Sequence, residues 1–293
     1  MRHQNFIIVA VLLTLLSSCS KPIANFVIRD AGKTAPAKVV FNNESKKADR
    51  FEWDFGDGKK SSDSLPTHEY RRSGNYFITL RAFKGKKVSE TKRQISVEAP
   101  LECLVEIETE FGTMLAVLSS KTPLHRDNFI NLAEEGYYDD LIFHRVISDF
   151  MIQGGDPNSR NAPAGTMLGT GGPDYKIKAE FVDTLFHTKG ALAAARTNNP
   201  AKESSGSQFY IVQGKKWTAE QLDYFEGSKG VRYTPEARKA YIENGGTPHL
   251  DKEYTVFGHI IKGLDIIDKI AAVSKDGNDR PTQDIKMKIK VIK

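Results

Sequence analysis

Short runs of alternating apolar and polar residues recur through the first hundred residues of the chain. The clearest runs are residues 39–41, 50–53, 76–80 and 95–97. Clusters of Asn, Gly, Lys and Ser separate them. A period of two predicts half-buried strands, and strands at this spacing are typical of a β-sandwich. Residues 26–98 are therefore expected to form an all-β domain, which ends before Pro100 because proline disfavours continued strand pairing.

Residues 100–293 are expected to form a second domain that combines strands with a few helices. Residues 101–109 and 113–118 are apolar runs joined by a short turn, which predicts a β-hairpin. Thr122 then precedes a proline and a series of apolar residues at helical spacing, so it is expected to cap a helix. Residues 285–291 alternate apolar residues with lysines, which predicts a last strand with one solvated face.

Composition and common motifs exclude several functions. The chain has 293 residues, of which 39% are hydrophobic and 27% charged, as in globular proteins long enough for two domains. Its 42 basic residues are scattered among 37 acidic ones, and no basic stretch carries interleaved aromatics, so nucleic-acid binding is not indicated. A P-loop, a G-x-S-x-G nucleophile motif and a C-x-x-C pair are all absent from the sequence.

The start of the chain has the pattern of an export signal. A short basic segment precedes the apolar run 6–16, which is shorter than the roughly 20 residues that span a bilayer. Residues 16–19 resemble the lipobox of bacterial lipoproteins, and the alternative is an ordinary cleaved signal with an incidental cysteine. The resemblance implies that residues 1–18 are removed, that Cys19 is acylated, and that residues 19–25 form a tether to a membrane.

One segment of the second domain carries the side chains of a candidate site. Residues 143–156 contain one guanidinium, one amide and several large apolar side chains, with two adjacent glycines near the end that allow a turn or a close backbone approach. In an extended strand Arg145, Met151 and Gln153 would share one face, unless a turn at residues 148–149 breaks the alternation. The alternative is a buried strand with one partly exposed arginine.

A second segment, residues 206–212, is another apolar run with one amide and follows the small residues of 193–195. The blocks F-H-R, F-M-I-Q-G-G-D and G-S-Q-F-Y-I, in this order, resemble the cyclophilin family of peptidyl-prolyl isomerases. The resemblance runs from about Glu102 to the C-terminus. It implies a closed β-barrel with flanking helices, proline-containing protein or peptide substrates, and no cofactor or metal. Residues 215–249 are a helix-prone insertion relative to compact members.

The resemblance assigns roles to single residues. Isomerisation passes through a twisted X–Pro bond whose nitrogen gains a lone pair, and Arg145 would donate a hydrogen bond to that nitrogen. Gln153 is the second implied catalytic residue and would hold substrate backbone, while the main chain at residues 195–196 would pair with residues around the proline. The implied substrate-binding residues are Phe150, Met151, Ala195, Arg196, Gln208, Tyr210, Leu250 and Tyr254.

Some positions differ from the family pattern. Tyr210 stands where phenylalanine is frequent, so the proline pocket is expected to gain a hydroxyl. His249 stands where cyclosporin-sensitive members have tryptophan, so weak cyclosporin binding is expected. Tyr254 replaces a frequent histidine and Arg196 a frequent asparagine. His144 is expected to be a structural histidine with satisfied hydrogen bonds.

The first domain has a motif of its own. The elements W-D-F-G-D-G, H-x-Y and G-x-Y, within residues 53–76, resemble a PKD domain, an immunoglobulin-like sandwich found on many bacterial surface proteins. Asp54 and Asp57 are carboxylates of the kind that bind hard cations, but aspartates at such turns more often bond their own backbone, so no metal site is assigned. The domain is expected to act as a spacer or to bind a protein or glycan of unknown identity.

The sequence therefore predicts a mainly β protein that is lipid-anchored outside the cytoplasm, at a periplasmic or cell-surface face. It would isomerise X–Pro bonds and so assist the folding of exported proteins, without covalent or metal catalysis. The alternatives are a non-catalytic chaperone that binds proline peptides and a surface adhesion module. Arg145 favours catalysis, because binding alone would not require it.

Overall fold

The structure is a computed structural model that describes residues 21–71, 73–98 and 102–292. The chain divides into two compact units, one up to Glu98 and one from Ala99 onward, and each is described by itself. The predicted export signal, Cys19 and the boundary at Pro100 lie outside the described residues. Within the described ranges, no helix combines the length and the apolar character needed to cross a membrane.

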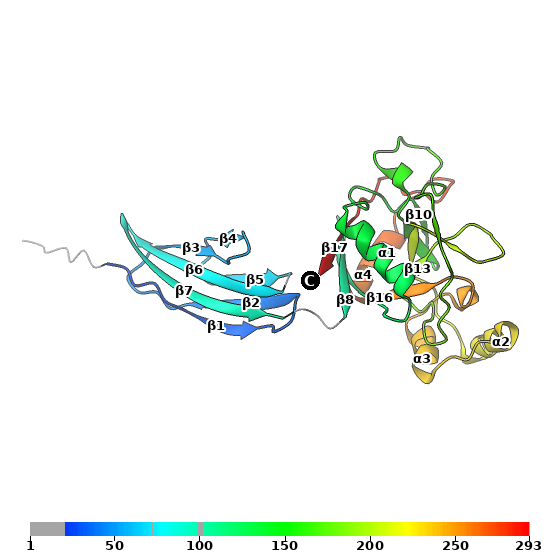
Figure 1. Ribbon diagram of the computed structural model, residues 1–293, viewed down its shortest axis with the longest axis horizontal. Coiled ribbons are helices and arrows are strands. Elements are labelled where there is room, and N and C mark those ends of the chain that lie inside the picture. Colours follow the sequence, from blue (N-terminus) through cyan, green and yellow to red (C-terminus); the bar gives the residue numbers. More distant parts are fainter. Residues whose placement is uncertain (1–20, 72, 99–101, 293) are drawn as a thin grey trace, which may run out of the picture. The chain divides into compact units, whose positions relative to one another are not determined.

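The N-terminal unit is a sandwich of two antiparallel sheets, coloured blue to blue-green in Figure 1. One sheet has the strand order β1-β2-β5 and the other β4-β3-β6-β7. The strands are β1 (Phe26–Ala31), β2 (Ala37–Asn43), β3 (Arg50–Asp54), β4 (Lys60–Ser61), β5 (Thr67–Tyr70), β6 (Gly74–Lys84) and β7 (Lys87–Val97). The sandwich core is aromatic, with the buried ring of Trp53 5.1 Å from Phe26 and 5.6 Å from Phe41 between centroids.

Asp54 and Asp57 of the W-D-F-G-D-G motif accept hydrogen bonds from the backbone of their own turn. Asp54 Oδ1 accepts from the backbone N–H of Gly56 at 2.9 Å, and Asp57 Oδ1 accepts from that of Lys59 at 3.1 Å. Asp57 Oδ2 lies 2.8 Å from Nε2 of the buried His68. These bonds confirm the turn role of both carboxylates. Among the described residues no group of three His, Cys, Asp or Glu is placed to hold a metal ion.

The first and last strands of the sandwich lie side by side and run in the same direction. Arg93 Nε in β7 donates to the carbonyl oxygen of Phe26 in β1 at 2.8 Å. Further along, the N–H of Glu98 donates to the carbonyl oxygen of Lys33 at 2.7 Å, and Thr34 and Glu98 form a parallel bridge. The chain therefore enters the sandwich at one end and leaves it at the other.

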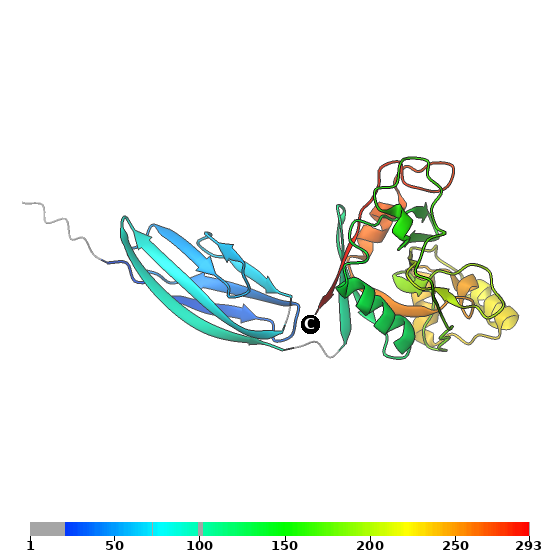
Figure 2. The ribbon, with the colours of Figure 1, turned by 45° about the horizontal axis from the view of Figure 1, so that its top comes forward.

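The C-terminal unit is built on a curled antiparallel sheet of eight strands in the order β10-β11-β15-β13-β16-β9-β8-β17, seen from two directions in Figures 1 and 2. Its strands are β8 (Cys103–Thr109), β9 (Gly112–Leu118), β10 (Arg145–Ile147), β11 (Met151–Gly154), β13 (Ala191–Ala194), β15 (Phe209–Val212), β16 (Val256–Lys262) and β17 (Lys288–Ile292), and a separate ribbon pairs β12 (Lys176–Ile177) with β14 (Ser204–Ser205). The predicted hairpin of β8 and β9 is confirmed.

The expectation of a closed barrel is not confirmed, because β10 and β17 are the two edges of the sheet. β10 has only three residues, and its central N–H, that of Val146, donates to the carbonyl oxygen of Asp279 in a loop at 2.8 Å. Only segments flanking the edge strands meet, where the N–H of Phe143 donates to the carbonyl oxygen of Ile285 at 3.0 Å. The sheet is thus curled but open in its strand order.

Helices pack against this sheet and contribute side chains to the core on its concave side. Their bounds are α1 (Pro123–Glu134), α2 (Ala219–Lys229), α3 (Pro235–Glu243) and α4 (Leu264–Ala271), with short 3-10 turns η1 (Pro157–Ser159) and η2 (Pro248–Leu250). α1 packs against β16 and β17, α4 packs against β9, β10 and β11, and both contribute buried residues such as Phe129 and Ile267 to the core inside the curl. The insertion 215–249 supplies α2 and α3, which form a peripheral pair coloured yellow in Figures 1 and 2.

The start of α1 differs from the expectation. Thr122 occupies the N-cap position, but its side chain makes no capping hydrogen bond. The carboxylate of Glu180 instead accepts from the N–H groups of Leu124 and His125 at 3.1 and 3.0 Å. A carboxylate at a helix N-terminus satisfies free donors and complements the helix dipole. Glu180 is distant in sequence, so local capping rules could not indicate it.

Candidate active site

The segment that carries the candidate site is a β-hairpin. β10 and β11 pair antiparallel, with Arg145 opposite Gln153 and Ile147 opposite Met151. The turn between them is present, and Asp149 adopts a left-handed conformation there with φ 62°. Residues directly opposite in an antiparallel pair share a face, so the pairing brings the guanidinium and the amide side by side even though a turn separates them. The shared face predicted for Arg145, Met151 and Gln153 is confirmed.

A contiguous apolar patch covers the face of the sheet beside this hairpin. It is formed by buried Met151, Ala191, Ala193, Ala195, Tyr210, Val212 and Val256, with Ile147, Phe150, Leu185, Leu250 and Tyr254 partly buried beside them. Six of the eight predicted substrate-binding residues are among them. Ile147, Leu185 and Val256 were missed as site residues. Strand alternation does place Ile147 on the arginine face, and Val256 is two residues from the predicted Tyr254, whereas nothing in the sequence near Leu185 marks a site.

Two glutamines and an unpartnered arginine form the polar side of the patch. Arg145 is partly exposed and makes no side-chain hydrogen bond or ion pair with another described residue. Gln153 Nε2 donates to Gln208 Oε1 at 3.1 Å, and Gln208 Nε2 donates to the carbonyl oxygen of Gly171 at 2.7 Å. This relay orients Gln153 and leaves its amide oxygen free to accept. The guanidinium therefore faces the groove with unused donors.

A cavity of about 330 Å³ adjoins this groove, and Gln153 and Gln208 line it together with the glycine-rich loop 169–176. Sequence reasoning missed this loop, because it matched no phosphate-binding motif. The buried carboxylate of Asp156 accepts from the N–H groups of Gly169 and Gly171 and so fixes the loop. A Cβ at Gly171 would lie 2.1 Å from Asp156 Oδ1, which explains why a glycine stands there. The glycine-rich composition was the available signal.

Comparison with known families agrees with this geometry. The family model for cyclophilin type peptidyl-prolyl cis-trans isomerases matches residues 104–291. The chain belongs to the cyclophilin family. The PKD domain model matches residues 19–98, so the cyclophilin domain is preceded by a PKD domain. Both families predicted from the sequence are confirmed.

Several bacterial relatives share the cyclophilin domain. A putative bifunctional phosphatase/peptidyl-prolyl cis-trans isomerase of Streptococcus pyogenes is 40% identical over 197 residues, which are 66% of this chain but only 39% of that protein. A putative peptidyl-prolyl cis-trans isomerase of Staphylococcus haemolyticus is 36% identical over 188 residues, or 63% of this chain and 88% of that protein. A solved Cryptosporidium parvum cyclophilin-type isomerase is similar at a TM-score of 0.47 and 25% identity, covering 65% of this chain and 97% of its own.

Tyr210 departs from the expectation for the cyclophilin pocket. Its ring lies in the apolar patch, but its hydroxyl points to His187 Nε2 at 3.0 Å. Burial raises the pKa of Tyr210 well above its usual value of 10, so it stays a neutral phenol. The expected gain of a hydroxyl in the pocket is therefore wrong, because a buried partner on a distant segment takes the hydroxyl.

Ala195 and its neighbour Arg196 were predicted to pair with a substrate through their main chain. Both backbone groups of Ala195 bond within the domain, because its N–H donates to the carbonyl oxygen of Gln208 at 2.9 Å and its carbonyl accepts from the N–H of Ser205 at 2.8 Å. The N–H of Ala195 is therefore already used within the domain. The Arg196 side chain turns away, with Nε donating to the carbonyl oxygen of Glu253 at 3.0 Å and the guanidinium 4.7 Å from the ring of Tyr254.

Two histidines lie close to the groove. His249 stacks on Phe150 with ring centroids 5.7 Å apart and so extends the apolar rim. His144 is buried beneath the Arg145 strand, and neither of its ring nitrogens has a hydrogen-bond partner among the described residues. The expectation of a satisfied histidine is therefore wrong. Burial, which disfavours the charged form, lowers the pKa of His144 to about 4.

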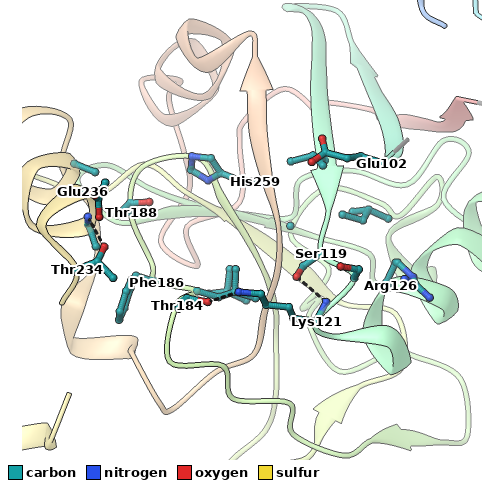
Figure 3. A pocket seen from close by; sticks show the side chains of 18 of the residues that line it. Glu102, Ser119, Lys121, Arg126, Thr184, Phe186, Thr188, Thr234, Glu236 and His259 are labelled. Atoms are coloured by element: carbon teal, nitrogen blue, oxygen red, sulfur yellow. Dashed lines mark hydrogen bonds between the residues drawn. The ribbon is translucent and has the colours of Figure 1, made fainter. Parts of the chain in front are cut away.

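A second cavity, of about 580 Å³, lies on the other side of Leu185 and Val256, which belong both to its lining and to the apolar patch. Figure 3 shows its polar lining residues, among them Glu236 of α3 and Lys121, whose Nζ donates to Thr184 Oγ1 at 2.9 Å. No residue of the β10–β11 hairpin lines it. The larger cavity is therefore separate from the candidate active site at the β10–β11 hairpin.

Proposed function

We propose that the chain uses the groove beside β10 and β11 to isomerise X–Pro bonds in proteins outside the cytoplasm, with Arg145 as the catalytic donor. Rotation about the amide bond has a barrier of about 18–20 kcal/mol and breaks no covalent bond, so no nucleophile or metal is needed. The observation that carries the proposal is the unpartnered guanidinium of Arg145 beside an apolar patch. A donor that bonds the pyramidal proline nitrogen stabilises only the twisted state, and such a donor contributes about 3 kcal/mol.

The neighbouring residues would bind the substrate on both sides of the rotating bond. Phe150, Met151, Tyr210 and Leu250 present an apolar surface on which a proline ring would pack. The free amide oxygen of Gln153 would accept from the substrate backbone. The adjoining cavity of about 330 Å³ offers room for a neighbouring substrate side chain.

Substituting Arg145 by alanine tests this function. The full chain is expected to accelerate isomerisation in a protease-coupled proline-peptide assay, and Arg145→Ala is expected to lower kcat/KM about a hundredfold while peptide affinity changes little. Arg232→Ala, which removes an exposed arginine of the insertion, is the matched control and should keep full activity. Peptide binding without any acceleration by the wild type would favour the alternative of a non-catalytic binding module.

We further propose that the protein is anchored to a bacterial membrane through lipid on Cys19, with both domains outside the cytoplasm. The export-signal pattern of residues 1–18 and the lipobox resemblance support this. Cys19→Ser is expected to move the protein from the membrane fraction to the soluble fraction while its isomerase activity persists. Membrane association that is unchanged in Cys19→Ser would contradict the anchor.

A further inference from the structure

A chain of buried hydrogen bonds runs from the floor of the groove to the insertion helix α3. It begins at Tyr210, whose hydroxyl lies 3.0 Å from His187 Nε2. His187 Nδ1 lies 2.8 Å from Asp251 Oδ1, and the hydroxyl of Tyr241 in α3 donates to Asp251 Oδ2 at 2.7 Å. All four side chains are at most 4% exposed. The link thus crosses from the sheet to the insertion through the interior of the domain.

The polarity of each bond follows from Asp251. Its carboxylate also accepts from the backbone N–H of His187 at 2.9 Å, so three donors converge on it. A carboxylate accepts only, so Nδ1 of His187 must carry the proton that it shares with Asp251. In a neutral imidazole Nε2 is then the acceptor, and the hydroxyl of Tyr210 donates to it. Every side chain in this series of hydrogen bonds is paired. Removing one of the four side chains therefore leaves a buried polar group without a partner.

Tyr210 and Tyr241, at the two ends of this series of hydrogen bonds, each pack tightly against their neighbours. Tyr210 forms part of the groove floor, 5.8 Å from the ring of Tyr254, and Leu250, which precedes Asp251, lies in the same patch. At the other end the ring of Tyr241 packs closely on the backbone at Gly246, where a Cβ would lie 2.5 Å from that ring. The same Cβ would lie 2.4 Å from the carbonyl oxygen of His187, which accepts from the N–H of Thr247 at 2.8 Å, so the insertion is seated directly on the segment that bears His187.

We propose that Tyr241 and Asp251 are positioning residues for the proline pocket, which act through His187 to fix the ring of Tyr210. This inference rests on the isomerase function proposed above. When all these hydrogen bonds are present, the hydroxyl of Tyr210 points away from the groove, and the floor of the pocket stays apolar and rigid. When the series is broken, the hydroxyl of Tyr210 loses its oriented acceptor and the ring is free to move. Because Arg145 is untouched, the effect falls on substrate binding and so on KM rather than kcat.

A double-mutant cycle on the full chain tests the coupling. Tyr241→Phe is expected to raise KM for a proline peptide about threefold or more with kcat nearly unchanged. In a Tyr210→Phe background, where the chain is already cut at the groove, the same substitution should raise KM no further. Tyr224→Phe is the matched control, because this tyrosine of α2 belongs to the same insertion but is 71% exposed. It should leave KM unchanged in both backgrounds.

Two kinetic outcomes would overturn the proposal. One is an unchanged KM in Tyr241→Phe, and the other is an equal rise in both backgrounds, which would indicate general loosening of the domain. Denaturant unfolding of each variant checks that it is folded, and Asp251→Asn replaces Tyr241→Phe in the cycle if the latter does not fold.

A second measurement separates this proposal from the isomerase function. The Nδ1 proton of His187 is followed by NMR while a proline peptide is added, and its resonance should shift in the wild type but not in Tyr210→Phe. The dissociation constant of the peptide is also measured for each variant of the double-mutant cycle. A wild type that binds without turnover would contradict the isomerase function, and the affinity cycle would still decide the coupling.

Discussion

Burial without a partner governs the chemistry of His144. Its pKa is lowered to about 4, whereas an unfolded histidine titrates near its usual 6.5. Between these values the unfolded chain binds the proton and the folded domain does not. The free energy of unfolding therefore falls as the pH falls through this window, and the loss between pH 7 and pH 5 is about 2 kcal/mol for this residue.

Replacing His144 by glutamine is expected to remove this contribution. The unfolding free energy of the cyclophilin domain would then decrease less between pH 7 and pH 5 in His144→Gln than in the wild type. Burial also lowers the pKa values of His125, His249 and His259, so a residual acid sensitivity is expected in the variant. Urea unfolding at pH 7 and pH 5 measures this difference in unfolding free energy. The signal is the fluorescence of Trp217, after Trp53→Phe has removed the other of the two tryptophans. Equal pH dependence in both proteins would contradict the prediction.

Side-chain direction was the least predictable property of single residues. Arg145 and Gln153 could be selected from the sequence because the motif holds them in one short segment and β-alternation aligns them. The directions of Tyr210 and Arg196 could not be predicted, since each depends on a partner far along the chain: His187 for the hydroxyl and Glu253 for the guanidinium. A sequence motif names the residue, but the distant partner decides which of its atoms faces the groove.

At the level of elements, the junction after β11 depends on a close backbone approach. Gly155 has φ +88°, and a Cβ there would lie 2.3 Å from the carbonyl oxygen of Ser207. Gly155→Ala is therefore expected to reduce the unfolding free energy by about 2–4 kcal/mol and to impair isomerisation, because β11 carries Met151 and Gln153.

Gly165→Ala is the matched control for this substitution. Gly165 has a similar φ of +77°, but no atom lies within 4 Å of its Cβ position, so only the backbone strain of about 1 kcal/mol is expected. Denaturant unfolding and the peptide assay on both variants provide the comparison. Equal losses in the two variants would show that the contact with Ser207 is unimportant.

Periodicity predicted the elements better than their connections. The hairpin of β8 and β9 and the helix after Pro123 follow from patterns within a few neighbouring residues. The cap of α1 did not follow, because Glu180 supplies it from far along the chain. Barrel closure was not predictable either, since the outer N–H of Val146 in the short β10 bonds the loop at Asp279 and only the flanking segments at Phe143 and Ile285 meet.

At the level of the whole molecule, the two domains have separate cores and only one of them carries groove residues. Every residue assigned to substrate binding or catalysis lies between Arg145 and Tyr254. Deleting residues 26–98 is therefore expected to leave kcat/KM for a proline peptide within about twofold of the wild type, as for changes far from a site. The peptide assay on the truncated chain measures this. A tenfold loss would show that the PKD domain takes part in catalysis.

The domain order and both families could be predicted because their motifs are contiguous and occur in the expected order. The attachment of the insertion could not. Residues 215–249 showed only helical composition, whereas the bonds of Tyr241 and the packing at Gly246 depend on the folded position of the segment around His187. An insertion that looks peripheral in sequence thus reaches the buried side of the groove.

The parallel course of β1 and β7 also determines how the PKD domain would respond to a pulling force. Tension between the two ends of the domain acts along both strands in opposite directions. It loads the contacts Ala24–Ser89, Phe26–Arg93 and Lys33–Glu98 together, in shear, instead of opening them one after another. Forced extension is limited by the rate of unfolding, and shared load keeps that rate low. A domain built in this way keeps its length when it is stretched.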